Sequence, residues 1–175
     1  MIHHQGSNFV ADTSFLINFL KIDRLDLLKK YPANFIITDH VIVEITDFYR
    51  EQKDRLMKAL AQKILTKISV IEENALDLFG ELVKKNRLGT GECSAIAYAI
   101  SKRYSLAIDD KRAIKEALSI SAELEMLRTE EFIFRLLQSR IITGEDAGVI
   151  IKNWEQKHRF KIKNSIQLLE TVTVS

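Results

Sequence analysis

Apolar and polar residues along the chain form two kinds of segment. Short apolar runs predict buried strands over residues 8–12, 34–38, 67–71, 104–108 and 125–127. Between them, apolar residues recur at helical spacing and predict helices over residues 15–20, 25–28, 50–65, 72–85, 92–100, 113–117, 130–139 and 144–156, with one more capped by Asp39. This alternation predicts an α/β fold, a three-layer α/β/α sandwich with a central parallel sheet.

Length and composition indicate one folded domain. The chain has 175 residues, 46% hydrophobic and 29% charged, which is typical of globular proteins and excludes disordered and collagen-like classes. The longest uncharged apolar run, residues 15–20, is far shorter than the roughly 20 residues that cross a bilayer, so no membrane span is expected. Residues 1–7 lack the basic and apolar regions of a secretory signal, and the single cysteine, Cys93, fits a reducing cytoplasm.

Acidic residues fall where the predicted elements meet. Asp12 ends the first strand and the pair Asp109 and Asp110 ends the fourth, so a parallel sheet brings them to the edge where ligand sites form. Glu92 opens an apolar helix, and Glu44 lies at the edge of an apolar stripe, where a solvated side chain is not expected. Carboxylates that converge in this way cannot all ionise comfortably unless cations share the site.

Other readings of these residues stay open. Taken singly, Asp12 and Asp110 fit helix caps, Glu92 fits a favourable first-turn acid, and Glu44 fits an ion-pair partner of Lys or Arg. Oxygen ligands suit Mg²⁺ or Mn²⁺, whereas zinc prefers His and Cys, which are few and badly spaced here. A phosphatase that forms an aspartyl phosphate would need Asp-x-Asp after the first strand, and this motif is absent. The hypothesis of a hydrolase that uses Cys93 with His40 is less favoured than the interpretation of Cys93 as a small buried helix residue.

Four motifs in order resemble the PIN domain nucleases, which include the toxins of VapBC-type toxin–antitoxin systems. They are FVADTSFLI (9–17), TDHVIVEI (38–45), LGTGECSAIA (88–97) and LAIDDKRA (106–113). The likeness spans residues 8–128, the expected nuclease core, and residues 129–175 are expected to form a helical C-terminal extension of the same domain.

The resemblance implies a metal-dependent ribonuclease with an acidic catalytic cluster. Asp12, Glu44 and Glu92 match the first three family acids, and Asp110 matches the fourth, with Asp109 one position away. These residues are the expected catalytic set, and the resemblance implies that Asp12, Glu44, Glu92 and Asp110 bind one or two Mg²⁺ or Mn²⁺ ions. Ser14 matches the small polar residue that helps to hold the first aspartate and the metal-bound water.

The substrate expected from the resemblance is RNA, single-stranded or structured. With a net charge of only +2, contacts to phosphates must come from local clusters, and residues 50–67 carry six cations against two acids. The residues expected to bind substrate are Ser14, Lys53, Lys58, Lys111 and Arg112. The expected protein partners are an antitoxin and a second copy of the chain in a homodimer. The alternative function is a non-catalytic PIN-like module that binds RNA or a protein.

Overall fold

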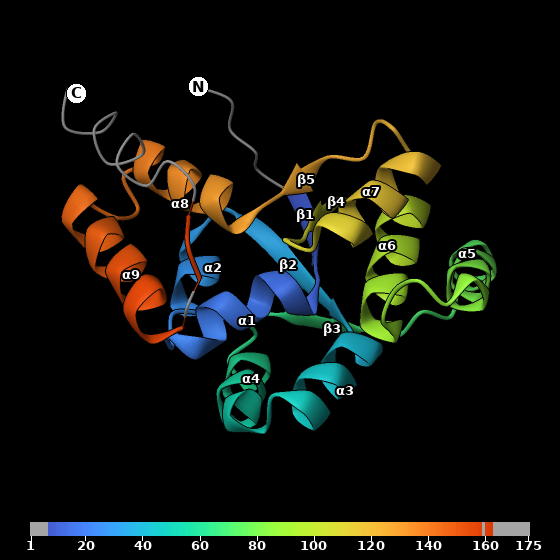
Figure 1. The fold of residues 1–175 in the computed structure, drawn as a ribbon, viewed down its shortest axis with the longest axis horizontal. Helices are drawn as coiled ribbons and strands as arrows, with labels where there is room; N and C mark the ends of the chain where they lie inside the picture. The colour runs from blue at the N-terminus through green and yellow to red at the C-terminus, as the bar shows by residue number, and fades with distance from the viewer. Residues whose placement is uncertain (1–6, 159, 163–175) are drawn as a thin grey trace.

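The computed structural model describes residues 7–158 and 160–162. Its centre is a five-stranded sheet in which every strand pairs in parallel, in the order β3-β2-β1-β4-β5 (Figure 1). The strands are β1 (Ser7–Ala11), β2 (Ala33–Thr38), β3 (Thr66–Ile68), β4 (Ser105–Ala107) and β5 (Met126–Leu127). The predicted α/β class and parallel sheet are confirmed.

Helices connect the strands, and two more helices follow the last strand. Those before β4 are α1 (Thr13–Lys21), α2 (Asp26–Lys30), α3 (Asp39–Phe48), the 3-10 turn η1 (Arg50–Gln52), α4 (Lys53–Ala61), α5 (Glu73–Lys85) and α6 (Thr90–Lys102). Those after β4 are α7 (Lys111–Ile120), α8 (Thr129–Gln138) and α9 (Gly144–Lys157). None of these helices is long and apolar enough to cross a membrane, as judged over the residues that the structure describes.

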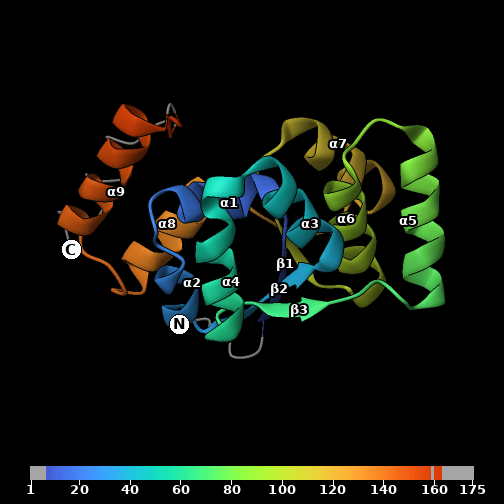
Figure 2. The same ribbon diagram turned by 90° about the horizontal axis from the view of Figure 1, so that it is seen from below.

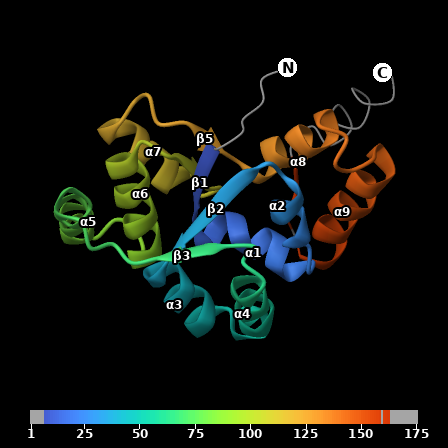
Figure 3. The ribbon, with the colours of Figure 1, turned by 180° about the vertical axis from the view of Figure 1, so that it is seen from behind.

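The helices form a layer on each side of the sheet. Figures 1 and 3 show α5, α6 and α7 on one side and α1, α2, α8 and α9 on the other, which gives the predicted three layers. Helix α6 packs against β1, β2 and β4, and its own outer side contacts α3 and α5. Figure 2, seen from below, shows α3 beside α6, at the end of the sheet where β2 leads into α3.

The strand order reverses direction between β1 and β4. Connections from β1 run outward to β2 and β3, whereas β4 returns to the other side of β1 and is followed by β5. Register pairs Ala11 with Ala107, so the two strands end side by side. In open parallel sheets such a switch point leaves a crevice at the carboxyl ends of the strands, where ligands bind.

The C-terminal helices share the core of the sheet. Phe132 of α8 packs edge-on against Phe15, Phe19 and Phe35, and Trp154 of α9 packs edge-on against Phe19. Both Phe132 and Trp154 are fully buried. Residues 129–157 are therefore part of one core with β1 and α1, and the predicted extension after residue 162 lies outside the described residues.

The structure corrects two local predictions. The cap of α3 is Thr38, whose hydroxyl accepts the Val41 N–H at 3.2 Å; Asp39 is the first helical residue. The helix predicted over residues 50–65 is shorter, because a 3-10 turn precedes α4, and the chain leaves the helix at Gln62 and passes through a positive φ of 54° at Lys63. This turn sends the buried Leu65 toward β3.

Candidate active site at the β1 and β4 ends

Asp12 lies in the turn between β1 and α1 and has no exposed surface. Its backbone N–H donates to the Ala107 carbonyl of β4 at 2.9 Å, which fixes the residue at the switch point. Its Oδ2 accepts the Ser14 N–H at 3.0 Å and so caps α1. Its Oδ1 is buried and has no hydrogen-bond partner. One oxygen therefore holds the helix and the other is left for a ligand.

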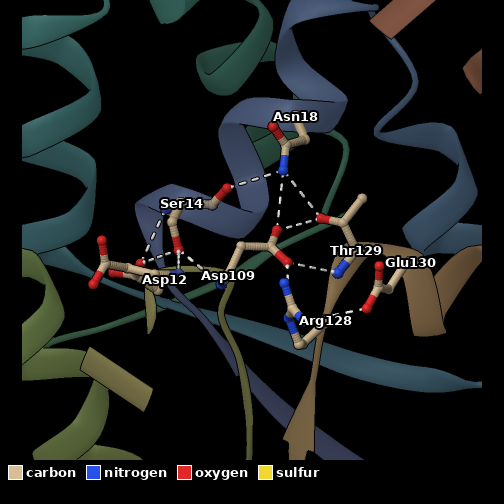
Figure 4. A network of polar contacts seen from close by, with 8 residues as sticks. Asp12, Ser14, Asn18, Asp109, Arg128, Thr129 and Glu130 are labelled. Carbon is tan, nitrogen blue, oxygen red and sulfur yellow. Dashed lines mark hydrogen bonds and ion pairs between the residues drawn. The ribbon is translucent and has the colours of Figure 1, made fainter. Parts of the chain in front are cut away.

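Ser14 fixes the orientation of Asp12 (Figure 4). The Ser14 hydroxyl accepts the backbone N–H groups of Asp109 at 2.9 Å and Asp110 at 3.3 Å, and lies 2.8 Å from Asp12 Oδ2. A hydroxyl has one hydrogen and two acceptor sites, so these two N–H groups leave its hydrogen for the carboxylate. Ser14 thus joins the end of β4 to Asp12, close to the supporting role that the family resemblance implies.

Glu44 reaches the site from α3 and is half-buried. Its Oε2 is buried and has no hydrogen-bond partner of normal geometry. It lies against Gly91 in the first turn of α6, where an added Cβ would fall 2.0 Å from this oxygen. Glycine at position 91 therefore provides the space for the Glu44 carboxylate.

Glu92 follows in the same first turn of α6. Its Oε2 accepts the Gly89 N–H at 2.9 Å and completes the capping arrangement of the helix. A carboxylate is also favoured here by the positive end of the helix dipole. Glu92 is the predicted first-turn acid, and this role is compatible with the predicted site role, because one oxygen is enough for the bond to Gly89.

The neighbours Asp109 and Asp110 have different environments. Asp110 caps α7 by accepting the N–H groups of Arg112 at 2.8 Å and Ala113 at 3.0 Å. Figure 4 shows the Asp109 carboxylate pointing away from Asp12, toward Asn18 and Thr129. The structure thus separates the two acids that sequence left as alternatives, with Asp110 beside Glu92 and Asp109 in a second network.

That second network ties the acidic site to α8 and α9. Asp109 accepts the Thr129 backbone N–H at 3.0 Å and the Asn18 side-chain amide at 3.0 Å, and the Thr129 hydroxyl also bonds to it. The backbone carbonyl of Asn18 in turn accepts the Trp154 indole N–H at 2.7 Å. Sequence reasoning missed Asn18 and Thr129, because their partners lie 91 and 20 positions away along the chain.

Burial, and after it charge repulsion, raises the pKa values of the clustered acids. Burial raises the pKa of Asp12 from 3.8 to about 6, and Glu44 adds to the increase. Burial, then Glu92, raises the pKa of Glu44. Burial raises the pKa of Glu92 as well, followed by Asp12 and Asp110, while Arg112 acts in the opposite direction. The four predicted metal ligands therefore interact electrostatically at one edge of the sheet.

The residues present fit a hard divalent cation. Asp12 Oδ1 and Glu44 Oε2 are buried carboxylate oxygens without a hydrogen bond of normal geometry, and burying a carboxylate is costly unless a cation or proton joins it. Within residues 7–158 and 160–162, no three His, Cys, Asp or Glu side chains are grouped so that all could hold one ion. Mg²⁺ commonly keeps several waters and binds through one or two carboxylates, which matches this more open arrangement.

The basic residues predicted from sequence divide between two places. Lys58 lines a hollow at the C-terminal end of α1, about 13 Å along that nine-residue helix from Asp12. In the same hollow Arg55 donates to α1 carbonyl oxygens at 2.7 and 3.1 Å, so it serves as a helix cap. Lys53 is exposed at the start of α4, whereas Lys111 and Arg112 are exposed directly after Asp110.

Cys93 does not have the environment of a nucleophile. Its thiol is fully buried, and burial, with Glu92 nearby, raises the pKa of Cys93 to about 11. A nucleophilic cysteine needs a lowered pKa and an accessible sulfur. The structure therefore supports the reading of Cys93 as a packed residue of α6.

Comparisons with known proteins agree with this arrangement. A family model described as PIN domain matches residues 8–171, which is most of the chain. No curated protein sequence matches the chain. The crystal structure of PAE2754 from Pyrobaculum aerophilum is similar in fold, with a TM-score of 0.51 and 16% sequence identity over 76% of this chain and 98% of that one.

Proposed function

Because the chain belongs to the PIN domain family, whose members are generally nucleases that use divalent metals, we propose that it is a metal-dependent endoribonuclease. The observation that carries the proposal is the pair of buried carboxylate oxygens without a hydrogen bond of normal geometry, Asp12 Oδ1 and Glu44 Oε2, beside the switch point of the sheet. A protein whose acids only capped helices would have no reason to bury these oxygens without partners.

The side chains have distinct tasks in this proposal. Asp12 and Glu44 bind Mg²⁺ or Mn²⁺ through their free oxygens, and Glu92 and Asp110 add negative charge that favours a cation. Ser14 holds Asp12 in one orientation. A bound ion would supply a water of lowered pKa for attack on phosphorus and would neutralise charge on the leaving oxygen. The chain itself supplies no nucleophile in this scheme.

The alternative, a non-catalytic module that binds RNA or protein, is disfavoured by the cost of the site. Burial and mutual repulsion raise the pKa values of Asp12, Glu44 and Glu92, so keeping all three ionised without a metal would cost folding free energy. Such costs are characteristic of functional sites. The antitoxin partner, the toxin role and the homodimer stay predictions, and they are tested by the genes beside this one and by the mass of the purified protein in solution.

The direct test is cleavage of a 5′-labelled single-stranded RNA by the purified protein. We expect cleavage in Mg²⁺ or Mn²⁺ and none in EDTA, and we expect Asp12→Asn, Glu44→Gln and Glu92→Gln each to lose most of the activity. Asp77→Asn, which changes an exposed carboxylate on α5 away from the site, is the matched control and should keep the activity. Cleavage that persists in EDTA, or in all three variants, would refute the proposal.

A further inference from the structure

Two surface hollows flank the glycine loop at residues 88–91. The first, the basic hollow, has a volume of about 520 Å³ and is lined by Arg87, Leu88, Arg112, Lys115, Glu116 and Ser119. The second, the aromatic hollow, has a volume of about 550 Å³ and is lined in part by His40, Val43, Glu44, Phe48 and the loop residues Gly89–Gly91. The loop thus separates two chemically different surfaces.

The basic hollow is suited to phosphate groups. It carries three cations against one carboxylate, Glu116. The Glu116 carboxylate accepts a hydrogen bond from Lys85 Nζ at 2.7 Å and lies 3.8 Å from a guanidinium nitrogen of Arg87. Arg87 and Arg112 keep 73% and 78% of their side-chain surface exposed, so their guanidinium groups are accessible. Accessible cations with a net positive balance favour binding of a polyanion.

The aromatic hollow is suited to a flat unpaired ring. Phe48, the last residue of α3, is 78% exposed, and Val43 on the same helix is 55% exposed. Asp39, His40 and Thr90 add polar groups to the lining, which could hydrogen-bond to a base edge. Aromatic side chains bind single-stranded nucleic acid by stacking on bases without strong sequence preference.

The acidic site lies between the two hollows. Glu44 itself lines the aromatic hollow, and Gly91, which makes room for the Glu44 carboxylate, lines it too. On the other side, Arg112 Nε of the basic hollow lies 3.9 Å from Asp110 Oδ1. A strand that touched both hollows would therefore pass over the carboxylates.

Building on the proposed ribonuclease function, we propose that single-stranded RNA crosses the glycine loop, with phosphates in the basic hollow and an unpaired base stacked on Phe48 in the aromatic hollow. A base inside a duplex has both faces covered by its neighbours, so the Phe48 contact selects unpaired RNA. The bond cleaved is one that lies between the two contacts, above the acidic site.

In this path the RNA phosphates contact the basic hollow and not the basic side chains of α4. The hollow beside α4 is lined by Arg55 and Lys58 but also by Asp23 and Asp26, so its charges balance. Arg55 is already bound to backbone carbonyl oxygens of α1. The basic hollow should therefore dominate the electrostatic part of RNA binding, and Lys53 with Lys58 should contribute little.

Paired charge reversals test the phosphate half of the path. Affinity of each full-length variant for a labelled single-stranded RNA is measured in EDTA, which prevents cleavage, at several salt concentrations. Arg87→Glu with Lys115→Glu should weaken binding about tenfold and reduce the salt slope by about 1.4, as expected for two lost phosphate contacts. Lys53→Glu with Lys58→Glu makes the same change of charge and should alter affinity less than about twofold. An equal or larger effect of the α4 pair would overturn the path.

Substitutions at Phe48 test the base half. Fluorescence of 2-aminopurine placed in the same RNA should be quenched on binding to the wild type and to Phe48→Trp but not to Phe48→Ala, whose affinity should fall about tenfold. Met57→Ala, a truncation of a 48% exposed side chain on α4, is the control and should match the wild type. Unchanged quenching in Phe48→Ala would refute the stacking contact. Failure of the wild type to cleave RNA in Mg²⁺ refutes the proposed function itself, whereas cleavage combined with either negative binding result refutes only the path.

Discussion

Asp12→Asn should stabilise the metal-free protein at neutral and alkaline pH while abolishing cleavage. Asp12 is fully buried, with a pKa raised from 3.8 to about 6 by burial and by Glu44. Each pKa unit corresponds to about 1.4 kcal/mol, so the ionised side chain costs the native state about 3 kcal/mol at pH 8. Asparagine keeps the cap on α1 because its carbonyl oxygen can accept from Ser14, and it removes the charge.

The pH dependence gives the sharper form of this prediction. The pKa of Asp12 is higher in the folded protein than in the unfolded chain. The favourable contribution of the protonated Asp12 side chain to stability is therefore fully present below about pH 4 and is lost as pH rises through about 6. The new amide leaves a buried N–H₂ that costs about 1–3 kcal/mol, but this cost does not change with pH. The advantage of the variant should thus grow by about 1.4 kcal/mol between pH 5 and pH 8, or about 3–6 °C in melting temperature.

Thermal unfolding in EDTA at pH 5 and pH 8 measures this difference. Asp77→Asn, at an exposed position on α5, is the control and should show no such growth. Adding Mn²⁺ at pH 7 should stabilise the wild type, by about 2.7 kcal/mol at one hundred times the dissociation constant, and should leave Asp12→Asn unchanged. A melting-temperature difference between variant and wild type that is the same at both pH values would refute the buried-charge argument.

Three further predictions concern the residues around the acids. Gly91→Ala should displace the Glu44 carboxylate, because the added Cβ would lie 2.0 Å from Oε2, and should lower the cleavage rate at least about tenfold. Gly80→Ala is the control: its Cβ would meet nothing within 4 Å, so the cleavage rate should be unchanged and the melting temperature should rise slightly. Ser14→Ala leaves two N–H groups and one carboxylate oxygen without their shared partner, so chemical denaturation should show a loss of about 1–3 kcal/mol together with slower cleavage. Cys93, buried with a pKa of about 11, should resist alkylation at pH 7 in the native protein and react after unfolding; rapid native reaction would contradict its packing.

Sequence pattern was sufficient for the elements that carry the acids. Alternation of apolar runs with helical spacing located every strand of the sheet within a few residues, and parallel strands necessarily bring Asp12 and the end of β4 to one edge. Sequence predicts Asp39 as the cap of α3, but the cap is Thr38; both residue types cap helices, and only the folded chain shows that the Thr38 hydroxyl meets the Val41 N–H.

The rest of the site depends on contacts between distant segments. Whether Asp109 or Asp110 faces the acids is decided by Asn18 and Thr129, which bind Asp109 and turn it away. The role of Gly91 depends on how closely α3 approaches α6. Similarly, the basic segment at residues 50–67 is evident in sequence, but the use of Arg55 as a cap on α1 appears only after folding.

Binding of Mn²⁺ measured by electron paramagnetic resonance, without RNA, tests the metal site most directly. We expect the wild type to reduce the signal of free Mn²⁺ by binding it, and Asp12→Asn and Glu44→Gln to lose this binding at the same protein concentration. Asp109→Asn, checked to be folded at the temperature of the measurement, should still bind Mn²⁺, because the Asp109 carboxylate points toward Asn18 and Thr129 (Figure 4). Binding that survives Asp12→Asn, or that is lost only in Asp109→Asn, would contradict the assignment of the site.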